Sequence, residues 1–400
     1  MTRHLFKLVW NRKRTNVLIL LEIFFSFLVV FLVSTLGIYF WDNYRQPLGF
    51  SYRNVWRIAV DTGGENEDDK AVAAAKIKTF TRLLEEVRKL GPIAAASGAL
   101  VSPYDQGGMS GNWRIDGKQV KMEMDIVDDS FADVVGLELM AGRWFRKTDQ
   151  ALAWDPIVID RDLARTVYGD QSPLGRQFGR PDPKETPIRV VGVVREFRKS
   201  GELSARSNFM FRRLRLAPPS QVVPGYLLVR VRPGTPGAFE EELTQLLQRV
   251  APDWSFAVKP LTQARAATFR MLLAPLVAGG LVAFFLLLMV GLGLIGVLWQ
   301  NLIQRTRELG LRRAAGASRT AVHRQVFFEQ VILTSLGVLL GAVLVIQLPI
   351  LDLITFIRPA VYLGGFLVSM AMIYLLSTVC ALYPSAMASR VQPAEALRYE

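Results

Sequence analysis

The charged residues best spaced for a specific contact lie in one basic stretch between two long apolar runs, where the sequence reads QRTRELGLRRAAGASRTAVH. If this stretch is helical, Arg305, Glu308 and Arg312 share one face, and the latter two stand at the i,i+4 spacing that favours an ion pair. Gly316 then ends the helix and Ser318 caps the next one. The alternative is a basic loop that only orients the neighbouring apolar runs in a membrane. Such a loop would need neither the glycines nor Glu308. The pattern predicts a short, rigid helix parallel to the membrane, followed by a turn into the next apolar run.

Nucleotide binding by this chain is not predicted. A phosphate loop surrounds the phosphates with backbone amides and has the pattern G-x-x-x-x-G-K-[ST]. The closest string runs from Gly192 to Ser200. It lacks the second glycine, and it follows a strand with no helix signal after it. We interpret Lys199-Ser200 within this string as a solvated turn.

Metal binding and nucleophilic catalysis are not predicted either. The only histidines, His4 and His323, are far apart and have no cysteine partners, and the patterns H-E-x-x-H and G-x-S-x-G do not occur. The acidic pairs Asp128-Asp129 and Asp160/Asp162 stand at strand-to-helix junctions, where an aspartate usually caps the helix. The sequence therefore predicts a non-catalytic chain with no cofactor or metal of its own.

The charge distribution points to a membrane rather than to nucleic acid. The 400 residues include 48 Lys+Arg and 35 Asp+Glu, which gives a formal net charge of +13. Residues 1–15 hold five basic residues and no acid, and residues 301–325 hold six arginines and one glutamate. Both clusters border apolar runs, where basic residues set the topology. No aromatic-basic module such as an RNP motif occurs, so nucleic-acid binding is not expected.

Four apolar runs are long enough to cross a membrane as helices, which takes about 20 residues each. The first run is too long for the apolar core of a signal peptide, and no A-x-A-like site follows it, so we expect an uncleaved anchor. The predicted fold class is an α-helical membrane protein with four transmembrane helices and a mixed α/β extracytoplasmic domain inserted between the first and the second. The runs are Asn16–Phe40, Met271–Trp299, Val326–Leu348 and Val361–Tyr383.

The positive-inside rule orients these four helices. Both basic clusters must face the cytoplasm, so the basic segment 1–15 and the loop 300–325 are predicted inside. Residues 41–270 then form the external domain and 349–360 a short external loop, with the tail 384–400 inside. These borders predict a multi-pass protein of the cell (inner) membrane with both termini in the cytoplasm.

The external domain has the pattern of alternating strands and helices. Strand–helix–strand units near both of its ends predict a split β-α-β layer with a segment inserted between the two halves. Residues 200–222 do not fit that layer, and we treat about 198–225 as an inserted subdomain or an edge. The last strand is expected to continue through 262–270 into the second apolar run. The expected strands are 55–60, 93–101, 119–127, 156–160, 188–197, 226–232 and 255–261, and the expected helices are 71–90, 130–137, 161–169 and 238–250.

Small and polar residues inside the apolar runs predict where helices pack. Gly337 and Gly341 form a G-x-x-x-G pattern, and Gly291 lies in a glycine-rich part of the second run. Such residues let helix backbones approach closely, within one chain or between two copies. Glu22 is the one acid well inside a run. It either reaches the cytoplasmic border or pairs with Arg14, or it makes a buried polar contact at a subunit interface.

The basic stretch resembles the signature of the FtsX-like permease family, and specifically of MacB-type permeases of ABC transporters, whose pattern is roughly R-x-x-E-I-G-x-x-R-A-x-G-A-S. Leu309 stands where isoleucine is usual. Further stretches resemble the family's extracytoplasmic core and its C-terminal tail, in the family's order. These stretches are 130–145, 162–178, 188–197 and 384–400.

The resemblance implies a dimer of permeases, with a second copy or a paralogue, served by separate ATP-binding subunits that hold ATP and Mg. It also implies that the first two helices transmit ATP-driven closure to the external domain, which handles an extracytoplasmic substrate or protein. The basic stretch would dock on the ATPase. The residues assigned to this ATPase coupling are Arg305, Glu308, Leu309, Gly310, Arg312, Arg313, Gly316, Ala317 and Ser318.

Three functions remain open at this point. The first is export or extrusion of a substrate by a MacB-type transporter. The second is a relay, as in FtsX, which activates an extracytoplasmic partner without transport. The third is a ligand-sensing receptor. The large external domain favours the first, because FtsX itself carries a much smaller one, and the sequence does not identify a substrate.

Overall fold

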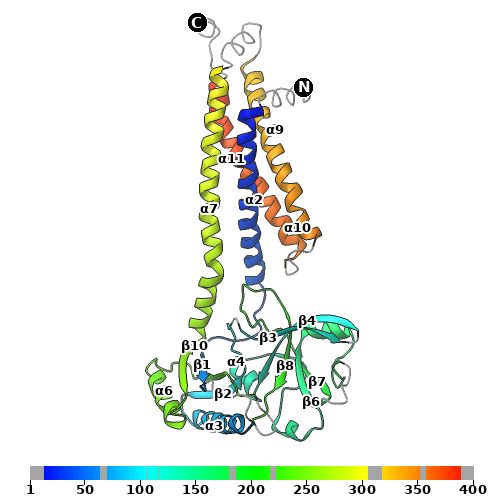
Figure 1. Cartoon of the computed structure of the whole chain (residues 1–400), viewed down its shortest axis with the longest axis vertical. Helices are drawn as coiled ribbons and strands as arrows, with labels where there is room; N and C mark the ends of the chain where they lie inside the picture. The colour runs from blue at the N-terminus through cyan, green and yellow to red at the C-terminus, as the bar shows by residue number, and fades with distance from the viewer. Residues whose placement is uncertain are drawn as a thin grey trace. The chain divides into compact units, whose positions relative to one another are not determined.

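The computed structural model describes residues 13–63, 70–105, 107–115, 117–179, 186–216, 222–304, 318–351 and 357–388. The elements are labelled in Figure 1. The chain divides into two compact units, one formed by Met1–Asp42 with Leu272–Glu400 and the other by Asn43–Met271. We call them the helical unit and the sheet unit, and each is described by itself.

Among its described residues, the helical unit contains four helices that are long and apolar enough to cross a membrane. The four predicted apolar helices are therefore confirmed. The short helix α10 (Gln347–Ile350) follows α9, and α9 packs along α11. The four long helices are α2 (Lys13–Tyr44), α7 (Leu261–Gln304), α9 (Arg319–Val345) and α11 (Pro359–Ala388).

The start of α7 differs from the prediction. Residues 262–270 were expected to continue a strand, but α7 begins at Leu261. The segment TQARAATFR is rich in alanine and arginine, which favour a helix, and it lacks the apolar alternation of a strand. As a result, the last part of the sheet unit is a helix that continues without a break into the second apolar run.

Elements from the two ends of the sheet unit's sequence form the predicted split β-α-β layer. Its strands follow the order β10-β1-β9-β2, with all neighbours antiparallel, which is the ferredoxin-like arrangement. Apolar side chains of α3 and α6 pack with these strands in one core. The elements are β1 (Val55–Asp61), α3 (Lys70–Arg88), β2 (Ile93–Ala99), β9 (Tyr226–Val231), α6 (Phe239–Val250) and β10 (Ser255–Pro260).

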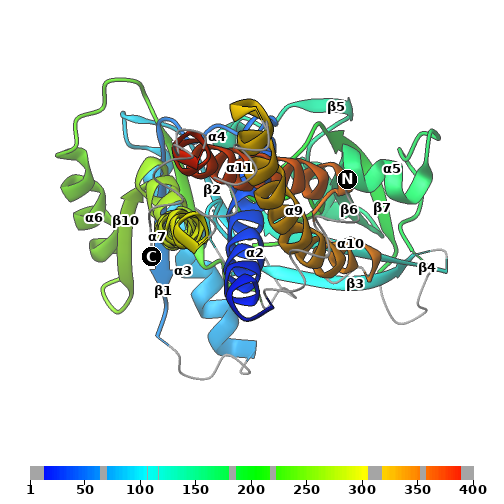
Figure 2. The ribbon, with the colours of Figure 1, turned by 90° about the horizontal axis from the view of Figure 1, so that it is seen from above.

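The segment inserted between β2 and β9 continues the same sheet, in the order β4-β8-β6-β7-β5, with β3 paired to β4. Figure 2 shows α5 beside β6 and β7 at one end of the sheet and α6 beside β10 at the other. The inserted elements are β3 (Met109–Ile115), β4 (Lys118–Val127), α4 (Phe131–Val135), β5 (Leu139–Gly142), the 3-10 helix η1 (Lys147–Ala151), β6 (Asp155–Asp160), α5 (Arg161–Tyr168), β7 (Ile188–Val194) and β8 (Asn208–Arg213).

Strand β8 corrects the interpretation of residues 200–222. It pairs in parallel with β4 and antiparallel with β6, so it belongs to the inserted segment as an interior strand of the sheet, and it is neither an edge nor a subdomain of its own. Phe209, Met210 and Phe211 are fully buried. Three consecutive apolar residues show no alternation, which is why the pattern gave no strand signal. The sequence also failed to predict β3, of which only Ile115 is buried, and β5, which is only four residues long.

An aromatic core lies next to β8 and fixes the segment that precedes it. The ring of Phe197 lies 4.7 Å from that of Phe209 and 5.0 Å from that of Phe211. Phe131 and Trp144 complete the cluster. Burying a side chain of this size contributes roughly 1.5–3 kcal/mol. The residues on either side of Phe197 are therefore held against the sheet.

Candidate functional site

One loop of the sheet unit, residues 196–206, contacts both the end of α2 and the beginning of α7. We call it the junction loop. It connects β7 to β8, and it includes Phe197 of the aromatic core. Since α2 and α7 contain the first two apolar runs, this loop is where the sheet unit holds the two segments that enter and leave it.

Arg198 binds the end of α2 to the junction loop. It is 2% exposed. Its Nη1 donates to the carbonyl oxygens of Asn43 at 2.8 Å and Gln46 at 3.2 Å. Its Nη2 donates to the carbonyl oxygen of Glu202 at 2.6 Å and to that of Ser204. A guanidinium holds its donors in a fixed planar fork, so one side chain fixes four backbone carbonyls at once.

The chain that follows α2 also lies directly on the junction loop. The side-chain amide of Asn43 donates to the carbonyl oxygen of Leu203 at 3.3 Å. Gly49 has φ +84°, and a Cβ atom there would lie 1.8 Å from the carbonyl oxygen of Glu196. Only glycine combines this conformation with so close an approach.

Glu202 binds the beginning of α7 to the same loop. Its Oε1 accepts from Nε of Arg265 at 2.6 Å, and its Oε2 accepts from the hydroxyl of Tyr104 at 3.0 Å. Desolvation opposes the charge of Arg265, but the hydrogen bond and charge of Glu202 raise its pKa. Burial and the neighbouring Glu202 raise the pKa of Tyr104, which therefore donates as a neutral phenol. The result is a charged pair of which Glu202 is the more buried member.

Aromatic rings connect α2 with α7 directly. The guanidinium of Arg265 lies 4.8 Å from the ring centre of Tyr52 and 4.4 Å from that of Phe269. Phe269 in turn meets Tyr44, the last residue of α2, edge-on at 6.3 Å between ring centres. Each such cation–π or ring contact contributes about 0.5–1.5 kcal/mol. The end of α2, the beginning of α7 and the junction loop thus form one connected set of contacts.

Lys199 is not in a solvated turn, so that interpretation was wrong. It is 7% exposed. Its Nζ donates to the carbonyl oxygen of Gly107 at 2.5 Å and lies 3.6 Å from Oε2 of Glu123 on β4. The neighbouring Phe197 draws this segment into the core, and Glu123 supplies the countercharge that burial of an ammonium requires.

Two buried aspartates lie elsewhere in the sheet unit. Asp125 accepts from the backbone amides of Val101 at 3.1 Å and Ile126 at 2.8 Å, and burial raises its pKa to about 8. Asp160 caps α5 by accepting from the amide of Leu163 at 2.8 Å, which confirms its predicted role. Burial raises the pKa of Asp160 to about 7. Asp128 does not cap α4; it pairs with Arg88 at 2.6 Å instead.

The raised pKa values predict that the sheet unit loses stability as pH rises. Asp125 keeps its proton in the folded state up to about pH 8 and releases it near pH 4 when unfolded. Stability is therefore highest below the unfolded pKa and falls as pH approaches 8, by on the order of 2 kcal/mol or more. Thermal unfolding of the full chain in detergent, followed by tryptophan fluorescence between about pH 5 and about pH 9, measures this slope.

Asp125→Asn is the matched variant for this prediction. Its side-chain oxygen can still accept from both amides but cannot ionise, so we expect a flatter pH profile. For Asp105 and Asp149, burial opposes the charge, but hydrogen bonds and neighbouring cations together lower the pKa, so neither aspartate contributes to this slope. An increase in unfolding temperature from about pH 5 to about pH 9 would contradict the prediction.

In the helical unit, the predicted glycines lie at close contacts between helices. A Cβ atom on Gly337 would lie 2.7 Å from Ile23, and one on Gly341 would lie 2.4 Å from Phe27. Both partners are on α2, so the G-x-x-x-G face of α9 is the surface that packs on α2. Gly291 has more room, since its Cβ would lie 3.5 Å from the sulfur of Cys380.

Glu22 lies against α7. A Cβ atom on Gly293 would be 2.6 Å from its Oε2. The glycine therefore leaves space for a carboxylate between two apolar helices. The side chain of Arg14, its predicted partner, lies outside the described residues.

Filling the space at Gly341 is expected to destabilise the helical unit. Gly341→Val places a branched side chain against Phe27, which is fully buried and has no room to move. Overpacking of this kind costs about 1–3 kcal/mol. The control is Gly296→Val, because nothing lies within 4 Å of a Cβ at that position. Equal thermal stability of the two variants in detergent would refute the packing role.

Of the predicted ATPase-coupling residues, the structure describes only Ser318. Ser318 precedes α9, and its hydroxyl lies 3.0 Å from that of Thr320. The others lie outside the described residues: Arg305, Glu308, Leu309, Gly310, Arg312, Arg313, Gly316 and Ala317. Their role stays a prediction.

Comparison with known proteins decides the family. Residues 17–246 match the MacB-like periplasmic core domain, and residues 280–393 match the FtsX-like permease C-terminal domain. The chain belongs to the MacB/FtsX-like ABC transporter permease family. The first match covers most of α2 and the sheet unit as far as Leu246 in α6, including the junction loop. The second covers more than half of α7, together with α9 and α11.

Curated relatives of this permease are identical to it at about a quarter of the aligned positions. The macrolide export ATP-binding/permease protein MacB of Pasteurella multocida is 24% identical over 295 residues, which is 68% of this chain and 42% of the relative. The ABC transporter permease YknZ of Bacillus subtilis is 25% identical over 285 residues, or 68% of this chain and 69% of the relative. The permease therefore spans about two fifths of the length of that MacB protein.

A solved structure resembles the sheet unit more distantly. The periplasmic region of MacB from Actinobacillus actinomycetemcomitans is 17% identical, with a TM-score of 0.38, over 54% of this chain and 93% of that one.

Proposed function

We propose that this chain is the membrane-spanning subunit of a MacB-type ABC transporter. In this proposal, ATP hydrolysis by a separate ATP-binding subunit changes the conformation of the extracytoplasmic sheet unit, which exports or extrudes a substrate. The observation that supports it is the junction loop, where one arginine and one glutamate bind the end of α2 and the beginning of α7 to the same backbone segment.

The contacts of the junction loop give a route for transmission. If the ends of α2 and α7 move relative to each other, either the loop follows or the bonds of Arg198 and Glu202 break. The loop leads into β8 at the centre of the inserted half of the sheet, and Phe197 packs on β8. A displacement of the loop is thereby imposed on that half. Transmission needs such contacts to differ between the ATP-bound and free states.

The ATP-binding subunit is expected to dock on the 305–318 stretch, with ATP and Mg bound in that subunit. The name of the Pasteurella MacB relative describes it as ATP-binding and permease together, and YknZ is named as a permease. We propose that here ATP binding lies on a separate chain, because the chain also aligns over 68% of its length with YknZ, which is named as a permease alone. A second permease copy or a paralogue completes the complex.

A relay without transport is the second candidate. The junction loop supports it too, because contacts between two helix ends and a sheet require no passage through the membrane. In that case the sheet unit activates an extracytoplasmic protein. ATP-dependent loss of a bound small molecule or lipid-linked substrate would favour export, whereas ATP-dependent activation of a bound protein would favour the relay.

The proposal is tested by purifying the full chain with an ABC ATP-binding subunit. We expect the two to co-purify, and the membrane chain to stimulate ATP hydrolysis in lipid nanodiscs. Spin labels on the sheet unit should report an ATP-dependent change in distance between the two copies. An ATP-binding subunit that neither binds the chain nor responds to it would refute the proposal.

The proposed topology gives a separate prediction. Alkaline phosphatase fused after Asp61 is expected to be active, because the enzyme folds only outside the cytoplasm. The same enzyme fused at the C-terminus should be inactive, while a cytoplasmic reporter such as green fluorescent protein should fluoresce there. The opposite pattern of activity would place the sheet unit in the cytoplasm and remove the basis for the proposed mechanism.

A further inference from the structure

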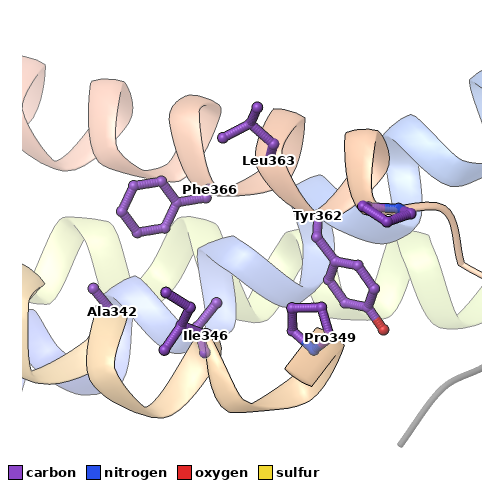
Figure 3. Close-up of a pocket in the computed structure, with 8 residues that line it drawn as sticks. Ala342, Ile346, Pro349, Tyr362, Leu363 and Phe366 are labelled. Carbon is purple, nitrogen blue, oxygen red and sulfur yellow. The ribbon is translucent and has the colours of Figure 1, made fainter. Parts of the chain in front are cut away.

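The ends of α9 and α11 enclose an apolar cavity of about 310 Å³. Figure 3 shows Tyr362, Leu363 and Phe366 of α11 on one side, and on the other Ala342 of α9, Pro349 of α10 and Ile346 between these two helices. Val345 and Pro359 complete the lining. Among the side chains of the lining residues, the hydroxyl of Tyr362 is the only polar group. The two prolines also contribute no backbone N–H group.

This lining decides what kind of molecule fits. An apolar cavity of this size stays dry, since water needs two or more polar partners. Its volume is at the lower end of ligand sites, so it suits a single chain or a small apolar molecule. Ile346 and Leu363 are each 59% exposed, which leaves the cavity open along the surface of the helices. In a membrane, the molecule that reaches such an opening is a lipid acyl chain.

A cation stands beside the cavity at the start of α11. Arg358 immediately precedes Pro359, and its carbonyl oxygen accepts the amide hydrogen of Val361 in the first turn. Its side chain is 61% exposed and lies 3.5 Å from Asp42 of α2. Because the side chains of both Arg358 and Asp42 are largely exposed, the pair leaves guanidinium donors facing solvent. A guanidinium presents paired N–H donors that match the oxygens of a lipid phosphate.

We propose that this cavity holds one acyl chain of a phospholipid whose phosphate is bound by Arg358. The inference goes beyond the proposed transport function and rests only on α9 and α11 crossing a membrane. Lipid tails are as apolar as leucine, so the cavity alone gives an acyl chain no preference over the surrounding bilayer. Selectivity must come from the headgroup contact. A second copy of the chain suits this site less, because a stable protein interface buries about 800 Å² per partner over a broad surface, not one small cavity.

Native mass spectrometry of the full chain tests the proposal, with phosphatidylglycerol as the probe. We expect the wild type to keep one phosphatidylglycerol at a detergent concentration that removes the others. Arg358→Gln should weaken this binding about tenfold while leaving the cavity intact. Ala342→Trp fills the cavity and should abolish the retained lipid, and Ala342→Leu should reduce it with less risk to folding.

The matched controls are Val343→Trp, which adds the same side chain on an exposed position next to Ala342, and Arg270→Gln, which removes an exposed cation elsewhere. Both should retain the lipid as the wild type does. Equal retention by Arg358→Gln and the wild type overturns the headgroup contact. Equal retention by Ala342→Leu, Ala342→Trp and Val343→Trp overturns the cavity as the site. Loss of a dimer together with the lipid in Ala342→Trp alone would assign the cavity to a second copy instead.

Discussion

Replacing Arg198 with alanine is expected to destabilise the sheet unit by about 3–5 kcal/mol, because it leaves buried carbonyl groups without donors. The carbonyl oxygens of Asn43, Gln46, Glu202 and Ser204 all accept from this one side chain. For a unit of this size, the unfolding temperature should fall by on the order of 10 °C. Thermal unfolding of the full chain in detergent measures the effect.

Two further variants separate the role of this geometry from that of charge. Arg198→Lys keeps the charge, but one ammonium cannot reach all four carbonyls, so it should recover less than half of the loss. Arg195→Ala removes a nearby exposed arginine whose partner is the exposed Glu138, and it should cost less than about 1 kcal/mol. A stability of Arg198→Ala equal to that of Arg195→Ala would show that the junction loop is not held by this guanidinium.

Arg198→Ala should impair the ATP-dependent change in the sheet unit more than it impairs binding of the ATP-binding subunit. The 305–318 stretch lies far from Arg198 in sequence and is unchanged in the variant, so the ATP-binding subunit should still co-purify. ATP-dependent distance changes in the sheet unit should be lost, because the end of α2 no longer pulls on the loop. A variant that stays folded at low temperature and transmits normally would leave the junction loop as a structural feature only.

The periodic spacing of apolar residues predicted those helices and strands in which burial follows a regular pattern along the sequence. The buried positions of α3, from Ala73 to Val87, follow the spacing of a helix, and β4 alternates buried and more exposed side chains from Gln119 to Met124. The split β-α-β layer followed from two such units. β8 was not predicted because Phe209, Met210 and Phe211 are all buried between two neighbouring strands. The six residues of β8 therefore show no alternation of apolar and polar side chains that would separate a strand from a loop.

The junction loop could not have been found from the sequence by the same reasoning. The acceptors of Arg198 are backbone carbonyls, which every residue has, and two of them are more than 150 positions away. Lys199 was predicted to be solvated because its ion-pair partner, Glu123 on β4, is far from it in the sequence. Gly49 was the one local signal, but glycine is common in turns. By contrast, Glu308 was assigned from the resemblance of its stretch to a family pattern, and it awaits a direct test.

Glu308→Lys is expected to uncouple the ATP-binding subunit while leaving membrane insertion intact. Reversing a charge at a docking surface places like charges together, which costs several kcal/mol. Stimulation of ATP hydrolysis should therefore fall more than about tenfold. Insertion should persist, because an added lysine strengthens the cytoplasmic positive charge that orients the helices. The measurement is ATPase activity and co-purification in nanodiscs, with Arg307→Gln, predicted on the opposite helix face, as the control.

A charge exchange separates docking from helix stability. In Glu308→Arg/Arg312→Glu, the i,i+4 pair of the predicted helix is retained with its direction reversed and the net charge of the loop is unchanged. If the glutamate only stabilises the helix, this double variant should recover most of the ATPase stimulation. If it contacts the ATP-binding subunit, the exchange should fail as badly as Glu308→Lys. We expect failure, because a docking surface on another chain presents fixed charges that do not exchange with it.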